Sequence, residues 1–287
     1  MLLKHFLEEG TASLEALYPA EEARGIVQML CSHFLGVKSY THIIEPEYSV
    51  DGDSLAALSA AMDRLRSGEP IQYVLGECEF CSRRFSLSPD ALIPRPETEL
   101  LCREALKLIG PSSRVLDLCT GSGCIAWTLA LGAPGAEVTG VDISEAALEV
   151  AGKQDFSSEM SSIGAVAPSF TRADILDFGT EFVSGTFDLI VSNPPYIMER
   201  EKAAMRRNVL DFEPSIALFV PDGDPLLFYR AVAHWSSRLL SVGGSGLVEI
   251  NETLSEETSE VFRSSGFAFV SVLKDFFDKK RFILFRR

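Results

Sequence analysis

Four consecutive residues, Asn193, Pro194, Pro195 and Tyr196, follow the apolar run 187–192 and combine an amide, two prolines and an aromatic ring. The run is short and continuous, which is typical of a buried strand. Each proline lacks an N–H and restricts the residue before it, so the loop leaves the strand stiff and extended. The Asn193 side-chain oxygen and the Pro194 carbonyl can then accept two hydrogen bonds from one planar NH2 group, and Tyr196 offers that group a flat surface. An ordinary proline-rich turn is the alternative.

A glycine-rich turn follows an earlier predicted strand. Its residues are Cys119, Thr120, Gly121, Ser122 and Gly123, and a predicted helix comes next. Such a turn lets a ligand approach the backbone closely. A dinucleotide-binding pattern would have its third glycine at position 126, where alanine is a permitted variant, so the turn alone does not specify the ligand.

Three aspartates stand at the ends of successive predicted strands. Asp142, followed by Ile143, lies about 20 residues after the turn, where a carboxylate can accept hydrogen bonds from both ribose hydroxyls. Asp174 can accept one from an adenine amino group, and Ile175 can pack on the purine. Asp117 suits a cationic ligand group, because it would repel a pyrophosphate. Each aspartate alone can be a strand-end or capping residue, but the three together favour a nucleoside site.

The glycine-rich turn, the three aspartates and the tetrapeptide can form one site only if the strands before them end at the same edge of a sheet. From residue 113 onward, strand and helix patterns alternate, which indicates a doubly wound α/β domain with ligands beyond the carboxyl ends of its strands. A helix to about residue 240 is expected to begin at Asp224 and Pro225. The predicted strands are 114–119, 137–143, 169–173, 187–192, 245–250, 267–273 and 281–285.

The region before this domain has a different pattern. Apolar residues recur at helical spacing up to about residue 70, which predicts a small all-α bundle used for docking, with Asp53 or Ser54 capping one helix. A hairpin is expected between residues 70 and 87. The turn-rich stretch 92–99 then leads to a helix that Thr98 could cap. This stretch is either a rigid linker or a loop over the reaction site.

Composition and charge limit the classes of protein to which this chain can belong. The 287 residues are 46% apolar and 23% charged, with a formal charge of −15, and no apolar stretch approaches the roughly 20 residues of a membrane span. Residues 1–82 carry five basic and thirteen acidic side chains, which disfavours nucleic acid and suits a basic protein partner. Without a secretory signal or a metal-like cysteine pairing, the six cysteines are expected to be reduced in a cytoplasmic protein without metal.

The chain from Asp117 to Ala126, the acidic end of the second strand and the Asn193–Tyr196 tetrapeptide together resemble class I methyltransferases that use S-adenosylmethionine. Further motifs resemble the peptide chain release factor glutamine methyltransferases, over essentially the whole chain. These motifs are Pro70-x-Gln72-Tyr73-x-x-Gly76, Leu92-Ile93-Pro94-Arg95-Pro96-Glu97-Thr98-Glu99, Phe212-Glu213-Pro214 and Ala217-Leu218-Phe219. The resemblance implies a Rossmann-like domain with a mainly parallel seven-stranded sheet. It also implies methylation of the glutamine amide in the Gly-Gly-Gln motif of release factors.

The resemblance assigns residues 1–72 to a helical substrate-docking domain, 73–93 to a hairpin linker and 94–287 to the methyltransferase domain. It places Arg95, Pro96, Glu97 and Thr98 in a loop near the substrate. The chain departs from the family where Val220–Pro225 replaces a glycine-rich run and where Asn251 replaces the glycine of Glu-Ile-Gly. We expect a monomer that methylates a protein and binds neither nucleic acid nor a membrane directly.

Positioning and electrostatics are the expected catalytic terms, because the sequence places no general base near the tetrapeptide and the face of the helix that carries His234 is not fixed. Three alternatives stay open. They are a nucleic-acid amine methyltransferase, a cofactor-binding scaffold without activity, and a nicotinamide dehydrogenase on the same sheet. The high acidic charge argues against the first of them.

Overall fold

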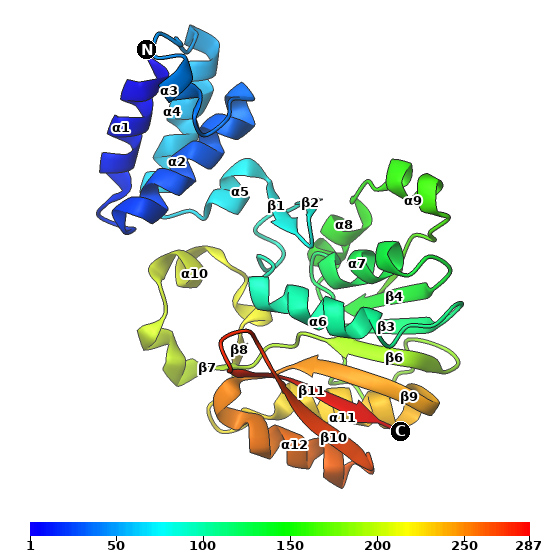
Figure 1. Cartoon of the computed structure of the whole chain (residues 1–287). Coiled ribbons are helices and arrows are strands. Elements are labelled where there is room, and N and C mark those ends of the chain that lie inside the picture. The colour runs from blue at the N-terminus through cyan, green and yellow to red at the C-terminus, as the bar shows by residue number, and fades with distance from the viewer. The chain divides into compact units, whose positions relative to one another are not determined.

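All 287 residues are described by the computed structural model (Figure 1), and they form two compact units. The first unit comprises Met1–Glu77 with Arg206–Phe212, and the second comprises Cys78–Met205 with Glu213–Arg287. A membrane-spanning helix is absent, because none is both long and apolar enough.

The first unit is a helical bundle. Its helices are α1 (Leu3–Leu14), α2 (Ala20–Leu35), α3 (Thr41–Ile44), α4 (Gly52–Arg66), α5 (Ile71–Leu75) and α10 (Arg207–Phe212). The apolar faces of α1, α2 and α4 form one core, with Leu14, Leu30 and Leu58 fully buried. This confirms the predicted all-α character of the region.

Two features of this bundle were not predicted. The helix α10 comes from far along the chain, and Arg206 before it pairs with Glu22 at 2.7 Å. The cap of α4 is Asp51, whose carboxylate accepts the Ser54 N–H at 2.8 Å. The prediction of Asp53 or Ser54 as the cap was therefore wrong, because the helix begins at Gly52 and not later.

The second unit is built on a seven-stranded sheet, as predicted. Its strands are β3 (Arg114–Leu118), β4 (Glu137–Asp142), β5 (Ser169–Arg172), β6 (Phe187–Ser192), β9 (Leu240–Glu249), β10 (Phe269–Lys274) and β11 (Lys280–Arg286). The order is β10-β11-β9-β6-β3-β4-β5. Six of these strands run in the same direction, and only β11, which lies between β9 and β10, is antiparallel to its neighbours. The carboxyl ends of β3, β4, β5, β6 and β9 therefore meet at one edge.

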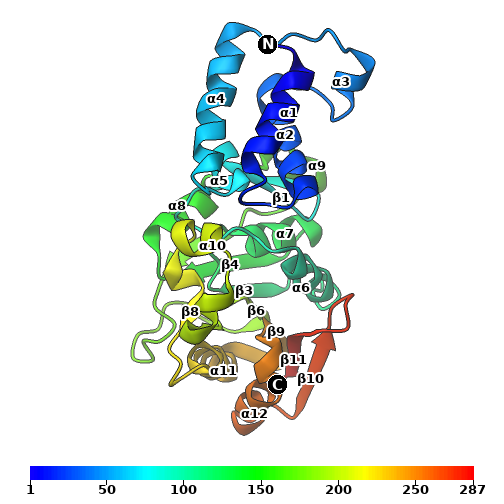
Figure 2. The ribbon, with the colours of Figure 1, turned by 90° about the vertical axis from the view of Figure 1, so that its left-hand side faces the viewer.

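Helices cover both faces of this sheet (Figures 1 and 2). The helices α6 (Pro96–Leu106) and α7 (Cys124–Gly132) contact each other on one face, and α11 (Leu227–Leu239) and α12 (Ser255–Ser264) contact each other on the opposite face. The segments that connect the strands along the chain contain further short elements. They are the helices α8 (Glu145–Gly152) and α9 (Ser157–Ile163), the short strands β7 (Ile197–Met198) and β8 (Phe219–Val220), and the 3-10 helices η1 (Glu199–Ala204), η2 (Ser215–Ala217) and η3 (Glu252–Leu254). Pairing β7 with β8 brings the segment after the tetrapeptide beside residues 219–220.

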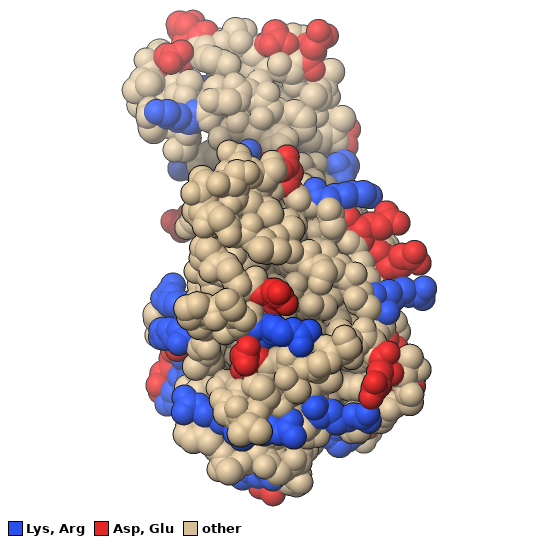
Figure 3. All heavy atoms as spheres, turned by 90° about the vertical axis from the view of Figure 1, so that its right-hand side faces the viewer, with Lys and Arg blue, Asp and Glu red and all other residues tan.

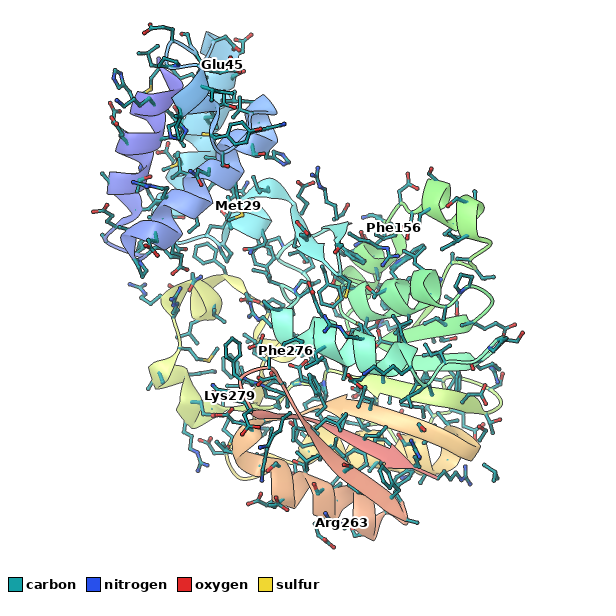
Figure 4. All side chains as sticks on the ribbon, in the orientation of Figure 1. Met29, Glu45, Phe156, Arg263, Phe276 and Lys279 are labelled. Atoms are coloured by element: carbon teal, nitrogen blue, oxygen red, sulfur yellow. The ribbon has the colours of Figure 1, made fainter.

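The predicted hairpin consists of β1 (Glu77–Phe80) and β2 (Arg83–Ser86). Its fully buried Phe85 lies 5.0 Å from Phe156, whose ring lies 5.3 Å from that of Trp127 on α7. Phe156 is labelled in Figure 4. This aromatic cluster anchors the hairpin to the second unit, and the segment that leaves β2 leads directly to the carboxyl edge of the sheet.

Two predicted helix starts were wrong. Arg95, not Thr98, occupies the cap position of α6, because Pro96 fits the first helical turn and starts the helix earlier. The helix α11 begins at Leu227, after a turn in which the Asp224 N–H donates to the Pro221 carbonyl. Thr98 is consequently free to use its hydroxyl elsewhere.

Candidate active site

A cavity of about 250 Å³ opens at the carboxyl edge of the parallel strands. Eight of the predicted site residues line it, namely Cys119, Gly121, Asp142, Ile143, Asp174, Ile175, Asn193 and Pro195. They come from the ends of β3, β4, β5 and β6, which are far apart in sequence. The fold thus brings the predicted nucleoside residues and the start of the tetrapeptide to one cavity.

The glycine-rich turn between β3 and α7 forms one wall. Its backbone takes positive φ at Cys119 (60°), Gly121 (54°) and Gly123 (76°). At Gly123 a Cβ atom would lie 2.9 Å from the Ala151 Cβ, so both the backbone conformation and the space require glycine. The turn thereby exposes the Gly121 backbone to the cavity.

Asp142 joins this turn to the end of β4. One of its oxygens accepts the Gly121 N–H at 2.8 Å, and the other accepts the Ser144 N–H at 2.9 Å. Burial raises the pKa of this carboxyl group, while the backbone N–H groups oppose the rise. Each oxygen keeps a lone pair for a further donor, which is what two neighbouring hydroxyl groups would require.

Asp174 and Ile175 lie beside Asp142 on the cavity wall, at the end of β5. One oxygen of Asp174 accepts the Leu176 N–H at 2.8 Å, which fixes the side chain and leaves the second oxygen for a ligand. Ile175 is buried, and the Trp235 indole N–H donates to its carbonyl at 2.8 Å. An acceptor beside a rigid apolar side chain suits the edge and the face of a purine.

Asp117 lies below the cavity and does not line it. Its side chain is 0% exposed, one oxygen accepts the Thr120 hydroxyl at 2.5 Å, and the other has no partner. Burial raises the pKa of this carboxyl group to about 7. A buried carboxylate oxygen without a partner fits a cationic ligand group, because an unpaired charge is costly in the interior.

Several other predicted residues also lie outside the cavity lining. Thr120, Ser122 and Gly123 are buried under the turn, and Pro194 is buried behind Asn193. Tyr196 is half-buried and packs against the hydrophobic core, with its hydroxyl 3.0 Å from a Glu249 oxygen. Burial, followed by the charge of Glu249, raises the pKa of this phenol.

The predicted substrate loop is tied to the protein by ion pairs. Arg95 contacts Glu213 at 2.7 Å, and Glu213 also accepts the Ile93 N–H at 3.2 Å. Glu97 lies 3.7 Å from Arg281 on β11. None of the four residues of this loop, Arg95, Pro96, Glu97 and Thr98, lines the cavity. The Arg95–Glu213 ion pair nevertheless joins the loop to the segment after Glu213, and that segment lines the cavity.

Twelve lining residues were not predicted as site residues. Five of them, Val141, Ser144, Ala147, Ala173 and Leu176, lie within five residues of Asp142 or Asp174, and the other seven come from segments farther away in the chain. These seven are Asp90, Ala91 and Leu92 after β2, Pro214, Ile216 and Ala217 around η2, and Phe228 on α11. Leu92, Pro214 and Ala217 belong to stretches singled out in the sequence, but no spacing rule places these stretches beside the glycine-rich turn. The Arg95–Glu213 ion pair, the Ile93–Glu213 hydrogen bond and the β7–β8 pairing help to hold the stretches around Leu92, Pro214 and Ala217 there.

At the acceptor end of the cavity, side chains hold Asn193 from behind. Its amide nitrogen donates to the Thr98 hydroxyl oxygen at 3.2 Å, and the Thr98 hydroxyl donates to Glu249 at 2.8 Å. The Asn251 amide donates to the Tyr196 carbonyl at 3.4 Å. The arrangement presents a fixed amide oxygen beside a site for a nucleoside that carries a cation.

Comparison with known proteins identifies the family. A model described as the PrmC N-terminal domain matches residues 5–76, and a methyltransferase domain model matches residues 109–224. The release factor glutamine methyltransferase of Bacteroides thetaiotaomicron is 39% identical over 276 residues, which are 96% of this chain and 96% of that protein. The protein of the same name from Flavobacterium psychrophilum is 35% identical over 288 residues, covering 99% of this chain and 98% of that one.

A solved methyltransferase from Pyrococcus furiosus shares the fold, with a TM-score of 0.50 and 16% identity over 79% of this chain and 98% of that chain. The identity to the two bacterial relatives extends over both compact units. The chain belongs to the release factor glutamine methyltransferase family.

Proposed function

We propose that this enzyme transfers the methyl group of S-adenosylmethionine to the side-chain amide nitrogen, N5, of the glutamine in the Gly-Gly-Gln motif of peptide chain release factors. The observation that carries the proposal is that Asn193 and Pro195 line the same cavity as Asp142 and Asp174. A donor of amide hydrogen bonds can therefore sit beside a bound nucleoside. Family membership supports the same substrate class.

S-adenosylmethionine is the methyl donor, and it supplies an electrophilic carbon on a sulfonium centre. Asp142 would accept from its ribose hydroxyls, and Asp174 with Ile175 would hold its adenine. The unpartnered oxygen of Asp117 suits its cationic amino-acid end. The turn residues Cys119 and Gly121 would contact it through the wall that they form.

The acceptor amide is a poor nucleophile because its lone pair is delocalised into the carbonyl. The Asn193 side-chain oxygen and the Pro194 carbonyl each accept one of its N–H groups, which fixes the nitrogen and favours its pyramidal form. Both hydrogen bonds strengthen as positive charge develops on the nitrogen, so they stabilise the transition state more than the ground state. Tyr196 would pack against the planar amide from beside the cavity, which it does not itself line.

No side chain is assigned to the last proton, which leaves to water. His234 is not used, because its ring lies 4.4 Å from Phe178 and 5.3 Å from Trp235 and does not line the cavity. Catalysis then rests on position and electrostatics.

A release factor fits the charge of this chain better than a nucleic acid. The formal charge is −15, and the face in Figure 3 carries acidic and basic side chains in small separate groups. A nucleic-acid enzyme would need a continuous basic surface. We place the reaction in the cytoplasm, where release factors act in translation termination, and propose that the enzyme works as a monomer whose residues 1–72 dock the substrate.

Mass spectrometry of a bacterial release factor after incubation with the enzyme and S-adenosylmethionine tests the proposal. We expect one added methyl group on the Gly-Gly-Gln peptide and none on a factor whose glutamine is replaced by glutamate. A parallel reaction with labelled cofactor and bulk RNA or DNA tests the alternative. Methylated nucleic acid with an unmodified release factor would overturn the proposal.

A further inference from the structure

Glu249 is a buried carboxylate at the end of β9 that has no cation in contact with it. The residue is 2% exposed. Its two oxygens accept hydroxyl hydrogens only, from Thr98 at 2.8 Å and from Tyr196 at 3.0 Å. The guanidinium group of Arg281 is paired instead with Asp275 at 3.0 Å and with Glu97 at 3.7 Å. A buried charge without a cation is costly, so its presence next to the tetrapeptide needs an explanation.

The ionised form of Glu249 fixes the direction of the hydrogen bonds that join Glu249, Thr98 and Asn193. A carboxylate has no hydrogen to give, so Thr98 must donate its single hydroxyl hydrogen to Glu249. The Thr98 oxygen can then only accept, and it accepts from the Asn193 amide nitrogen at 3.2 Å. Because Glu249 accepts the hydrogen of Thr98, the Thr98 oxygen must in turn accept a hydrogen from the Asn193 amide.

This direction decides which end of the Asn193 amide meets the substrate. The oxygen and the NH2 group of asparagine are similar in size, so packing alone does not distinguish the two orientations. With its nitrogen bound to Thr98, the amide turns its oxygen away from Thr98, as an acceptor for another donor. The reversed amide would present an NH2 group, which cannot accept a hydrogen bond from a glutamine N–H.

We propose that Glu249 is a positioning residue for methyl transfer, which acts through Thr98 to hold the Asn193 oxygen toward the acceptor amide. The same carboxylate binds the Tyr196 hydroxyl, so it links the first and the fourth residue of the tetrapeptide. The inference rests on the proposed function, because it gives Asn193 an acceptor role. It adds Glu249 and Thr98, neither of which lines the cavity.

The variant Glu249→Gln separates this role from simple packing. Glutamine has nearly the same shape, but it offers one oxygen and one NH2 group to the two hydroxyls. When the NH2 group faces Thr98, the hydroxyl hydrogen of Thr98 is released to bind the Asn193 oxygen, and the amide reverses. The variant therefore populates the wrong orientation without creating a cavity.

Steady-state kinetics on a release factor test the inference with three variants. Thr98→Val removes both bonds of the hydroxyl at constant shape, and we expect kcat to fall about 10- to 100-fold, the scale of a misplaced catalytic group. Thr98→Ser keeps the hydroxyl and should restore kcat to within about threefold. Glu249→Gln should lower kcat about tenfold. The Kd for S-adenosylmethionine and the Tm should stay near the wild-type values for all three.

The double variant Thr98→Val with Glu249→Gln sharpens the test. If Glu249 acts through Thr98, the double variant should be no slower than Thr98→Val alone. Wild-type kcat in Thr98→Val would overturn the inference, and so would losses that multiply in the double variant. A Tm drop that accounts for the lost activity would show a structural role and overturn it as well.

An independent readout keeps this inference separate from the proposed function. If the wild type methylates no release factor, the proposed function fails. The side-chain 15N–1H signals of Asn193, identified by their loss in Asn193→Asp, then test the orientation without turnover. We expect one slowly exchanging N–H that becomes fast in Thr98→Val and in Glu249→Gln but not in Thr98→Ser. Unchanged exchange in the first two variants would overturn the inference.

Discussion

At the nucleoside end of the cavity, the carboxylates find their protein partners nearby in the chain. Asp142 accepts from backbone groups 21 and 2 residues away, and Asp174 from one 2 residues away. At the acceptor end, the bonds from Asn193 to Thr98 and from Thr98 to Glu249 span 95 and 151 residues. One end is built from backbone N–H groups in turns, and the other from side chains that only the complete fold brings together.

Because the two ends are built differently, substitutions at each end should impair a different property of the enzyme. A change at the nucleoside end should weaken cofactor binding, because the turn and its carboxylates are the proposed contacts to the ligand. A change at the acceptor end should lower turnover and leave cofactor affinity intact, because Asn193 is the proposed contact to the second substrate. Variants at the two ends should therefore show opposite patterns of kcat and Kd.

The largest effect is expected for Asn193→Ala. Loss of one preorganised polar partner of the reacting group should lower kcat by about a hundredfold or more. The Kd for S-adenosylmethionine, measured by calorimetry, should change by less than about threefold, because Asp142 and Asp174 are untouched. Wild-type turnover in this variant would refute the role of the side chain.

Asp142→Asn should give the reverse pattern. An amide at this position turns an NH2 group toward either the Gly121 N–H or the Ser144 N–H, so one of the two bonds is lost along with the charge. Hydrogen bonds to charged groups contribute about 1.5–3 kcal/mol, so the Kd should rise about 10- to 100-fold. At saturating cofactor, kcat should stay near that of the wild type. Unchanged affinity would contradict the assignment of Asp142 to the ligand.

Asp117→Asn should reveal the cost of an unpartnered buried charge. The folded protein keeps the proton of Asp117 up to about pH 7, whereas the unfolded chain loses it near 3.8, so stability falls as pH rises between these values. Asparagine cannot ionise, and a gain of about 1 kcal/mol would raise the Tm by about 2–4 °C at pH 8. The gain should shrink as the pH falls and vanish below about pH 3.8.

Two further measurements complete the test of Asp117. Thermal unfolding without cofactor at pH 5 and pH 8 gives the stability difference, and a Tm difference that is equal at both values would contradict the assignment. Calorimetry at pH 8 should show weaker cofactor binding in Asp117→Asn, because the variant removes the carboxylate proposed to face the ligand cation.

The smallest effect is expected for Asn251→Ala, at a position where the family commonly has glycine. The Asn251 side chain caps η3 by accepting the Thr253 N–H at 3.0 Å, and its amide reaches the Tyr196 carbonyl only at 3.4 Å. Loss of the cap should cost about 1 kcal/mol in unfolding free energy, while kcat should stay within about threefold. A loss of turnover as large as that of Thr98→Val would extend the positioning cluster to Asn251.

The sequence predicted what local rules control. Alternating strands and helices gave the seven-stranded sheet, and apolar spacing gave the helical bundle. Asp142, Asp174, Asn193 and Pro195 were predicted to lie together, and they line the cavity because parallel strands end at one edge. The starts of α4, α6 and α11 were wrong, because several neighbouring residues can cap a helix and the choice among them depends on local packing.

Tertiary structure alone decided the rest. It moved residues 206–212 into the helical unit, tied Arg95 to Glu213 and brought Pro214 and Ile216 to the cavity. It also placed Thr98 and Glu249 behind Asn193, over 95 and 151 residues of chain. A local motif can specify a turn, because its own backbone makes the bonds. A chain of side-chain hydrogen bonds exists only after the sheet and its helices have packed.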